Sequence, residues 1–191
     1  MNRNDISWEG NFTAIVTPFA QDGSVDDKAF AKNIELLVSE GLNGIIVTGC
    51  TGEFWSMTDE ERVHVWELAV KTAGGKIPVI AGSMDKLTTR TVQLSKEAKR
   101  VGCDGVMITP PYYILPHEGE VREHFETVSQ EVQLPILVYN IPKRVGFNTT
   151  PQFLRELTEI EMVVAVKQSS PVFEDVVETV ALCGEKIKVF A

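Results

Sequence analysis

The sequence predicts an α/β protein of the TIM (β/α)8 barrel class, incomplete at its C-terminal end. Short apolar runs rich in β-branched residues alternate with longer segments of helical period. The runs are apolar along nearly their whole length, which is typical of a parallel sheet covered by helices. The sequence has neither GxGxxG after its first run nor GxxxxGK(S/T) anywhere. These are the usual signatures of nucleotide-binding open sheets, so the barrel is favoured over an open sheet.

Seven strands are expected from these runs. In chain order they are FTAIVTPF (12–19), GIIVTG (44–49), IPVIAG (77–82), DGVMITP (104–110), LPILVYN (134–140), MVVAVK (162–167) and IKVFA (187–191). Each run is short and dominated by apolar residues, as a strand buried on both faces is.

Six helices are expected between the strands. The first follows Ser24 and has Asp26 and Asp27 in its first turn, where carboxylates favour a helix start. The second covers 58–73 and begins with Thr58 and Glu61, which have the spacing of a capping box. The other four are expected at about 87–101, 118–131, 151–158 and 172–182.

The length of the chain limits how much of a barrel it contains. An eight-stranded barrel usually takes about 250 residues, whereas this sequence has 191 and stops on the seventh expected strand. We therefore expect residues 1–191 to form a single (β/α) barrel domain that is truncated before the eighth βα unit.

Composition excludes several classes of function. The net charge of −9 argues against nucleic acid or an acidic membrane surface as a partner, because both are bound by clustered Lys and Arg. No apolar run approaches the roughly 18 residues of a membrane span, and the first residues have no apolar signal region. We expect a cytoplasmic protein. Neither a disulfide framework nor a metal site is expected, because the cysteines and histidines have no such spacing.

The chemically unusual residues all fall where expected strands end. GCTGE (49–53) follows the second strand, TPPYY (109–113) ends and follows the fourth, YNIPKR (139–144) ends and follows the fifth, and Lys167 ends the sixth. In (β/α) barrels the active site is built on this C-terminal face of the strands. The sequence therefore predicts a functional site there.

Lys167 is the central candidate. An amine beside apolar packing has its charged form disfavoured, so part of it is neutral and nucleophilic near pH 7. Such a lysine can form a Schiff base with a carbonyl compound. The alternative is a lysine that extends from a strand end into solvent.

The neighbouring motifs favour the catalytic interpretation. Backbone N–H groups in the GCTGE turn can hold a carboxylate, although a generic turn has the same composition. Tyr139 can shuttle protons, or it is a core tyrosine. Arg144 can bind a substrate carboxylate in a fork, or it is solvated. The PPYY segment is expected to be a rigid loop with aromatic anchors. Together these residues describe a pocket for a keto acid.

These motifs, in this order, resemble a family, the pyruvate-dependent class I aldolases typified by dihydrodipicolinate synthase and N-acetylneuraminate lyase. The resemblance runs from about Asn11 to the last residue and includes GxTGE, PPYY, YNIPxR and VK. It implies a barrel in which Lys167 forms the Schiff base with pyruvate and Tyr139 relays protons. It also implies that the amides of Cys50 and Thr51 hold the pyruvate carboxylate.

The resemblance further implies an oligomer. In the synthases the position matching Tyr113 reaches into the neighbouring subunit's site, and the arginine matching Arg144 helps to bind the carboxylate of the aldehyde. We therefore expect a homodimer or homotetramer. The candidate catalytic residues are Lys167, Tyr139, Tyr113 and Thr51, and the candidate substrate-binding residues are Gly49, Cys50, Thr51 and Arg144.

Three departures from the family pattern bear on substrate choice. Cys50 stands where the synthases usually have a threonine that links two tyrosines, and a thiol is a weaker hydrogen-bond donor than a hydroxyl. Gln168, Ser169 and Ser170 follow the lysine where Glu-Ala is frequent, and Ile114 replaces an asparagine. These changes lean away from a strict lysine-biosynthetic synthase, whereas Arg144 and the tyrosine pair lean toward it.

The expected function is that of a Schiff-base lyase that acts on pyruvate, without a metal or organic cofactor. The first candidate reaction is condensation of pyruvate with aspartate semialdehyde, which gives 4-hydroxy-tetrahydrodipicolinate. An alternative is cleavage or dehydration of a 2-keto-3-deoxy sugar acid. An alternative of another class is a non-catalytic barrel that binds a keto acid, which predicts pyruvate binding without exchange of the methyl protons.

Overall fold

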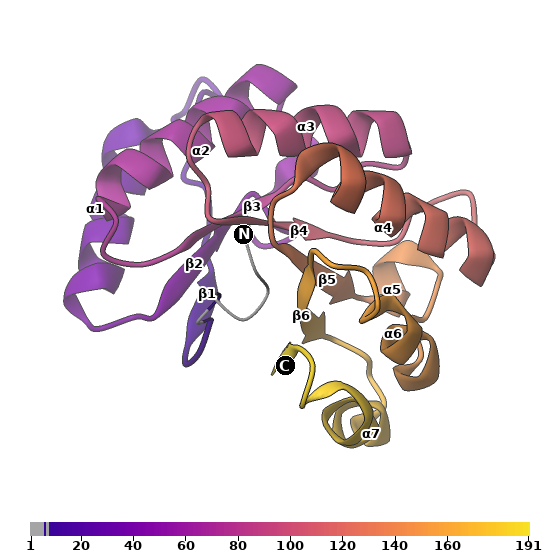
Figure 1. Ribbon diagram of the computed structural model, residues 1–191. Helices are drawn as coiled ribbons and strands as arrows, with labels where there is room; N and C mark the ends of the chain where they lie inside the picture. Colours follow the sequence, from indigo (N-terminus) through magenta and orange to yellow (C-terminus); the bar gives the residue numbers. More distant parts are fainter. Residues whose placement is uncertain (1–5, 7) are drawn as a thin grey trace.

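The chain forms one curled sheet of seven parallel strands, ordered β1 to β7 as in the sequence. The computed structural model describes residue 6 and residues 8–191. The strands are β1 Phe12–Ala14, β2 Gly44–Val47, β3 Val79–Gly82, β4 Gly105–Ile108, β5 Ile136–Asn140, β6 Val163–Gln168 and β7 Lys188–Phe190. Figure 1 shows the helices on the outer side of this curled sheet. The predicted incomplete (β/α) barrel is confirmed.

Every expected helix is present. The helices are α1 Asp27–Ser39, α2 Asp59–Ala73, α3 Thr88–Arg100, α4 Glu118–Val132, α6 Pro151–Leu157 and α7 Phe173–Cys183, with two additional short elements, the 3-10 helix η2 Phe54–Ser56 and α5 Pro142–Val145. The four-residue α5 begins with a proline, whose fixed φ suits the first helical position, and ends at Gly146 in the left-handed region. It is too short to show a helical period in the sequence.

The first strand is shorter than the expected 12–19. The strand ends at Ala14, although Ile15 still donates its N–H to the carbonyl of Ile46. Pro18 has no N–H to contribute to the sheet, and the chain there turns back so that Phe19 pairs with Val25 in an isolated antiparallel bridge.

The strands bury side chains in two different apolar cores, and their residues alternate between these cores except at the register shift in β6, where Val164 and Ala165 both belong to the inner one. One core fills the inside of the curled sheet and includes Ile46, Ile80, Met107 and Leu137. The other lies between the sheet and the helices and includes their sequence neighbours, among them Ile45, Val106, Ile108 and Val138. Because both faces are buried, the strands are continuously apolar, which is the pattern that predicted a parallel sheet.

The sheet has two free edges, β1 and β7. Among the residues that the structure describes, no hydrogen-bonded strand pair joins these edges. The ring centroids of Phe12 on β1 and Phe190 on β7 nevertheless lie only 5.0 Å apart.

Among the described residues, no helix has both the length and the apolar character of a transmembrane span.

The predicted capping box at the start of α2 is confirmed. The N–H of Thr58 donates to Glu61 Oε2 over 2.8 Å, and the N–H of Glu61 donates to Thr58 Oγ1 over 3.2 Å. These two bonds satisfy orphan donors at the helix start. They hold α2 at the end of the loop that carries the GCTGE motif.

His124 gives the fold a measurable dependence on pH. Its imidazole is 1% exposed on α4, with Nδ1 2.9 Å from Thr88 Oγ1, and burial lowers its pKa from 6.5 to about 4. As the pH falls, the His124 imidazole of the unfolded chain therefore becomes protonated near pH 6.5, whereas that of the folded chain becomes protonated only near pH 4. The stabilisation is fully present above pH 6.5 and is lost as the pH falls toward 4.

We expect His124→Gln to reduce this acid sensitivity. Wild type should lose roughly 2 to 3 kcal/mol of unfolding free energy between pH 7 and pH 4.5 through this residue, and the variant should lose less by that amount. Urea unfolding at the two pH values measures the difference. His117→Gln, at an exposed histidine, is the matched control. Equal pH dependence in wild type and His124→Gln would contradict the prediction.

Candidate active site

The strand register brings two of the predicted residues together. Tyr139 on β5 is paired directly with Lys167 on β6, and both face the inside of the curled sheet, as Leu137 and Ala165 do two residues earlier. Lys167 Nζ lies 4.2 Å from the centroid of the Tyr139 ring. An amine is therefore held against an aromatic face at the C-terminal ends of two adjacent strands.

The environment of Lys167 favours its neutral form. Burial lowers the pKa of its amine below the ordinary value of 10.5, and the nearby Cys50 opposes this in part. Desolvation disfavours an ammonium because the apolar surroundings cannot replace its hydration. A larger fraction of this amine is neutral near pH 7 than of a solvated lysine.

The environment of Tyr139 keeps its phenol protonated. The side chain is 3% exposed. Burial is the main cause that raises its pKa well above 10. The electrostatic interaction with Cys50 and the hydrogen bond to Cys50 raise the pKa further. A hydrogen bond to Ser169 and the charge of Arg144 act in the opposite direction. The phenol therefore stays protonated at neutral pH and can act as a proton donor. Its hydrogen-bond partners are the Cys50 thiol and the Ser169 hydroxyl.

The turn that carries the GCTGE motif is strained and firmly held. Thr48 has φ 50°, a left-handed conformation that is unfavourable for a β-branched residue. Its Oγ1 donates to the carbonyl of Gly82 and accepts a 2.7 Å bond from Trp66 Nε1. A Cβ at Gly82 would lie 2.2 Å from the carbonyl oxygen of Thr48, so only glycine permits this approach. Strain of this kind concentrates at functional sites.

The backbone after Thr48 is available to a ligand. No described residue accepts a hydrogen bond from the N–H of Cys50 or Thr51. Consecutive free N–H groups in a turn form a concave site that suits an anion. This is the arrangement expected for holding a carboxylate beside Lys167.

Asn140 fixes the ends of β5 and β6 relative to each other. It is fully buried, and its Nδ2 donates to Gln168 Oε1 over 2.7 Å and to Asn148 Oδ1 over 3.0 Å. The N–H of Ser169 donates to the carbonyl of Asn140. A satisfied buried polar network restricts the geometry of the groups that it joins, so Tyr139 and Lys167 are held in position by their neighbours.

A cavity of about 200 Å³ opens beside this cluster. It is lined by Cys50, Phe54, Trp55, Met84, Thr109, Tyr112, Ile141, Arg144 and Val145. Most of its wall is apolar, and Arg144 supplies the permanent positive charge. The cavity therefore suits a small molecule that has an anionic group.

The structure brings together most of the predicted site residues. Cys50, Tyr139 and Lys167 meet at the strand ends. Gly49 directly precedes Cys50, Arg144 lies at the border of the cavity, and Thr51 is exposed in the turn. Tyr113 lies apart from them. Its side chain is 87% exposed at φ 79° and does not line the cavity.

Sequence reasoning missed Thr109, Tyr112, Asn140 and Ser169 as members of the site. For Ser169 a signal existed, because it follows Lys167 by two positions and therefore points to the same side of the extended chain. Thr109 and Asn140 lie within the TPPYY and YNIPKR motifs, but nothing in the sequence distinguishes them from structural residues.

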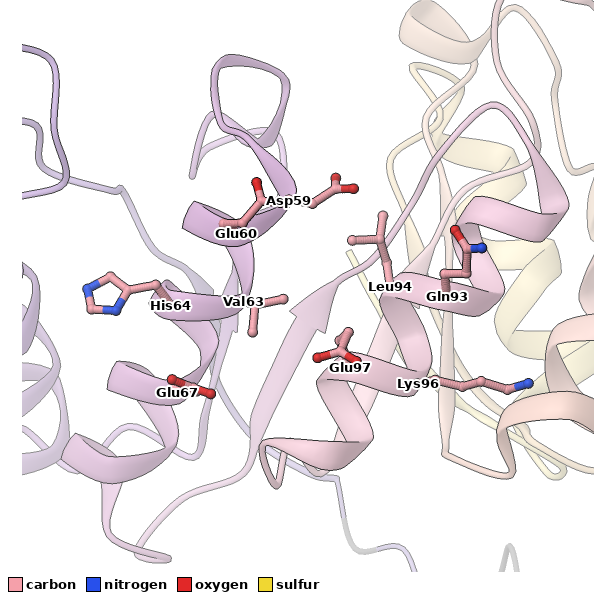
Figure 2. Close-up of a pocket in the computed structure, with 9 residues that line it drawn as sticks. All are labelled: Asp59, Glu60, Val63, His64, Glu67, Gln93, Leu94, Lys96 and Glu97. Atoms are coloured by element: carbon pink, nitrogen blue, oxygen red, sulfur yellow. The ribbon is translucent and has the colours of Figure 1, made fainter.

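A larger hollow lies elsewhere, on the outer helical layer. It has a volume of about 560 Å³ and lies between α2 and α3. Figure 2 shows its side chains, which come from those two helices: Asp59, Glu60, Val63, His64, Glu67, Gln93, Leu94, Lys96 and Glu97. Most of its charges are paired, for example Asp59 with Arg90 and Lys96 with Glu131. Neither Lys167 nor Tyr139 lines this outer hollow.

The chain is a parallel (β/α) half-barrel that has a half-buried lysine, a protonated tyrosine and a turn suited to an anion at its strand ends. These features place it in the class of (β/α) barrel proteins whose candidate site is centred on a lysine. Within this class, the chain belongs to the dihydrodipicolinate synthetase family, which it matches over residues 7–191.

The chain is similar to known proteins in both sequence and structure. An uncharacterized DapA-like lyase of Rhizobium meliloti is 42% identical, over 96% of this chain and 61% of the relative. The crystal structure of dihydrodipicolinate synthase from Aquifex aeolicus superposes with a TM-score of 0.90 at 41% identity, over 95% of this chain and 62% of that one. The chloride-inhibited enzyme from Acinetobacter baumannii, complexed with pyruvate, gives a TM-score of 0.93 at 31% identity, covering 96% and 63%. The chain thus spans about three-fifths of the length of these relatives.

Proposed function

We propose that the protein is a pyruvate-dependent Schiff-base lyase. The observation that carries this proposal is the position of Lys167 Nζ, which is desolvated, has a lowered pKa and lies 4.2 Å from the ring centroid of the buried Tyr139. A nucleophilic amine beside a proton donor is what imine formation requires. Membership in the dihydrodipicolinate synthetase family supports the same reaction class.

The proposed reaction begins with addition of the neutral Lys167 amine to the ketone carbon of pyruvate. Loss of water gives an iminium, and loss of a methyl proton from this iminium gives an enamine. The enamine carbon then attacks an aldehyde, and hydrolysis of the resulting iminium releases the product and restores the amine. Cleavage of an aldol product is the reverse. Tyr139 gives and takes the protons of these steps.

The free amides of Cys50 and Thr51 are proposed to hold the pyruvate carboxylate. They lie in the turn after β2. Cys50 is close enough to Tyr139 and Lys167 to raise the pKa of both side chains. Cys50 also takes the place of a hydroxyl in the proton relay. The thiol hydrogen bond to Tyr139 is proposed to preserve that connection in a weaker form.

Aspartate semialdehyde is the first candidate for the aldehyde. Several relatives that are 34% to 40% identical bear the name 4-hydroxy-tetrahydrodipicolinate synthase. Arg144 at the border of the cavity provides a partner for the carboxylate of such an aldehyde.

We also propose a homo-oligomer in which Tyr113 completes a neighbouring site. Tyr113, Ile114 and Leu115 are 87%, 62% and 66% exposed, and all three belong to the loop after β4. Contiguous exposed apolar side chains of this kind are typical of interaction surfaces. Sedimentation or light scattering measures the state, and a monomer in solution would contradict this part of the proposal.

Borohydride reduction in the presence of pyruvate tests the proposed chemistry. Mass spectrometry of the intact protein and of its peptides should find one pyruvate adduct, located on Lys167. The wild-type protein should also exchange the methyl protons of pyruvate with deuterium oxide. Absence of the adduct on folded protein would refute the lyase proposal. An adduct or bound pyruvate without proton exchange would instead indicate a non-catalytic keto-acid-binding barrel.

A further inference from the structure

Thr109 has a buried hydroxyl without a partner. The residue directly follows β4 and is 4% exposed, and its Oγ1 makes no hydrogen bond with any described residue. Buried polar groups are nearly always hydrogen-bonded, because an unpaired one keeps the full cost of its desolvation. Such a group beside a ligand cavity suggests that the ligand supplies the missing partner.

The strand register places Thr109 in line with the reactive pair. Ile108 on β4 is opposite Val138 on β5, so the next residues along the two strands, Thr109 and Tyr139, lie side by side. Tyr139 is in turn opposite Lys167. These three residues form a row across the C-terminal ends of three adjacent strands.

The direction of the Thr109 side chain follows from the alternation along β4. Met107 belongs to the inner core, whereas Ile108 belongs to the core between the sheet and the helices. Thr109, one residue further, therefore faces inward as Met107 does. This places its side chain on the same side of the sheet as Tyr139.

Thr109 also lines the cavity of about 200 Å³ beside the reactive pair. The cavity wall is otherwise mainly apolar, with Phe54, Trp55, Met84, Ile141 and Val145. The cavity is sized for a small second substrate, with Arg144 available for its carboxylate.

We propose that Thr109 is a catalytic residue, whose hydroxyl donates a hydrogen bond to the carbonyl oxygen of a small, carboxylate-bearing aldehyde. This inference rests on the proposed function. When the enamine carbon forms the new C–C bond, the π electron pair of the aldehyde C=O moves onto its oxygen. A preorganised donor at that oxygen stabilises the charge that develops there, and Tyr139 then protonates it.

Two variants of Thr109 separate the hydroxyl from the shape of the side chain. Thr109→Val replaces the hydroxyl by a methyl group and should lower kcat/KM for the aldehyde on the order of 10²-fold. Thr109→Ser keeps the hydroxyl and should retain most of the wild-type value. Neither change should alter the yield of the pyruvate adduct on Lys167 or the exchange of the pyruvate methyl protons, since these steps precede aldehyde binding.

Thr149→Val is the matched control. Thr149 also has a buried Oγ1 without a hydrogen-bond partner among the described residues and is 0% exposed, but it does not line the cavity. The same chemical change at that position should leave kcat/KM for the aldehyde unchanged. The probes are aspartate semialdehyde and succinic semialdehyde, both of which carry a carboxylate.

Several outcomes would overturn the inference. Wild-type kcat/KM in Thr109→Val, or an equal loss in Thr109→Ser, would show that the hydroxyl has no such role. Should Thr109→Val fail to fold, a comparison of Thr109→Ala with Thr109→Ser decides the same question. Adduct formation in wild type without condensation of either aldehyde would refute the assigned substrate class while leaving the Schiff-base chemistry intact. If the wild-type protein formed no pyruvate adduct, the proposed function itself would be refuted.

Discussion

Lys167→Ala is expected to lose at least about 10³-fold in kcat for condensation, because covalent catalysis has no substitute once the amine is absent. The substitution shortens a half-buried side chain on β6 and leaves the strand backbone unaltered. The borohydride-trapped adduct and the exchange of pyruvate methyl protons should disappear together. A coupled assay of turnover, with mass spectrometry of the reduced protein, measures both.

The pH dependence of the wild-type enzyme belongs to the same prediction. The lowered pKa of Lys167 means that the neutral amine becomes available at a lower pH than in a solvated lysine. The rate of adduct formation should therefore rise with pH and level off below pH 10.5, the ordinary value of this amine.

Lys143→Ala is the control for Lys167→Ala. Lys143 is an exposed lysine in α5, one residue before Arg144. Its removal should leave adduct formation and turnover close to wild type. If Lys167→Ala were trapped by pyruvate as efficiently as Lys143→Ala, another amine would be the nucleophile and the assignment of Lys167 would be wrong.

Tyr139→Phe is expected to lower kcat on the order of 10²- to 10⁴-fold, the usual contribution of a general acid or base. Phenylalanine keeps the ring that lies 4.2 Å from Lys167 Nζ, so the amine should retain its place. Only the phenol proton is removed, together with the hydrogen bonds to Cys50 and Ser169. The pyruvate adduct should still form, but more slowly.

Two measurements distinguish this role of Tyr139 from a structural one. Single-turnover kinetics should show slow imine formation and slow proton exchange in Tyr139→Phe, with an unchanged final yield of adduct. The raised pKa of Tyr139 also means that wild type keeps this proton through pH 10. A variant with wild-type rates, or a fall in wild-type activity attributable to phenol ionisation near neutral pH, would contradict the prediction.

The sheet and most helices were predictable because their signals are local. Continuous apolar runs mark strands that are buried on both faces, and the Thr58 and Glu61 pair marked the start of α2, as the structure confirms. The first strand and α5 were less accessible. The length of β1 depends on where the chain leaves the sheet before Pro18, and α5 has only four residues.

The candidate site also contains some residues that the sequence indicates and others that it does not. Lys167 and Tyr139 were predictable as candidates because a cation and a phenol at apolar strand ends are conspicuous in the sequence. The strained turn at Thr48, held by Trp66 and closely approached by Gly82, has no such signal. It depends on contacts between three separate parts of the chain.

The sequence by itself therefore determined the order of strands and helices, and it singled out Lys167 and the C-terminal strand ends as the candidate site. Periodicity and residue type carry this information within short windows. The tertiary structure alone decided that Lys167 lies over the Tyr139 ring, that Asn140 ties β5 to β6, and that Thr109 stands beside them with an unpaired hydroxyl. These facts follow from strand register and from the accounting of buried hydrogen bonds, which join residues far apart in the chain.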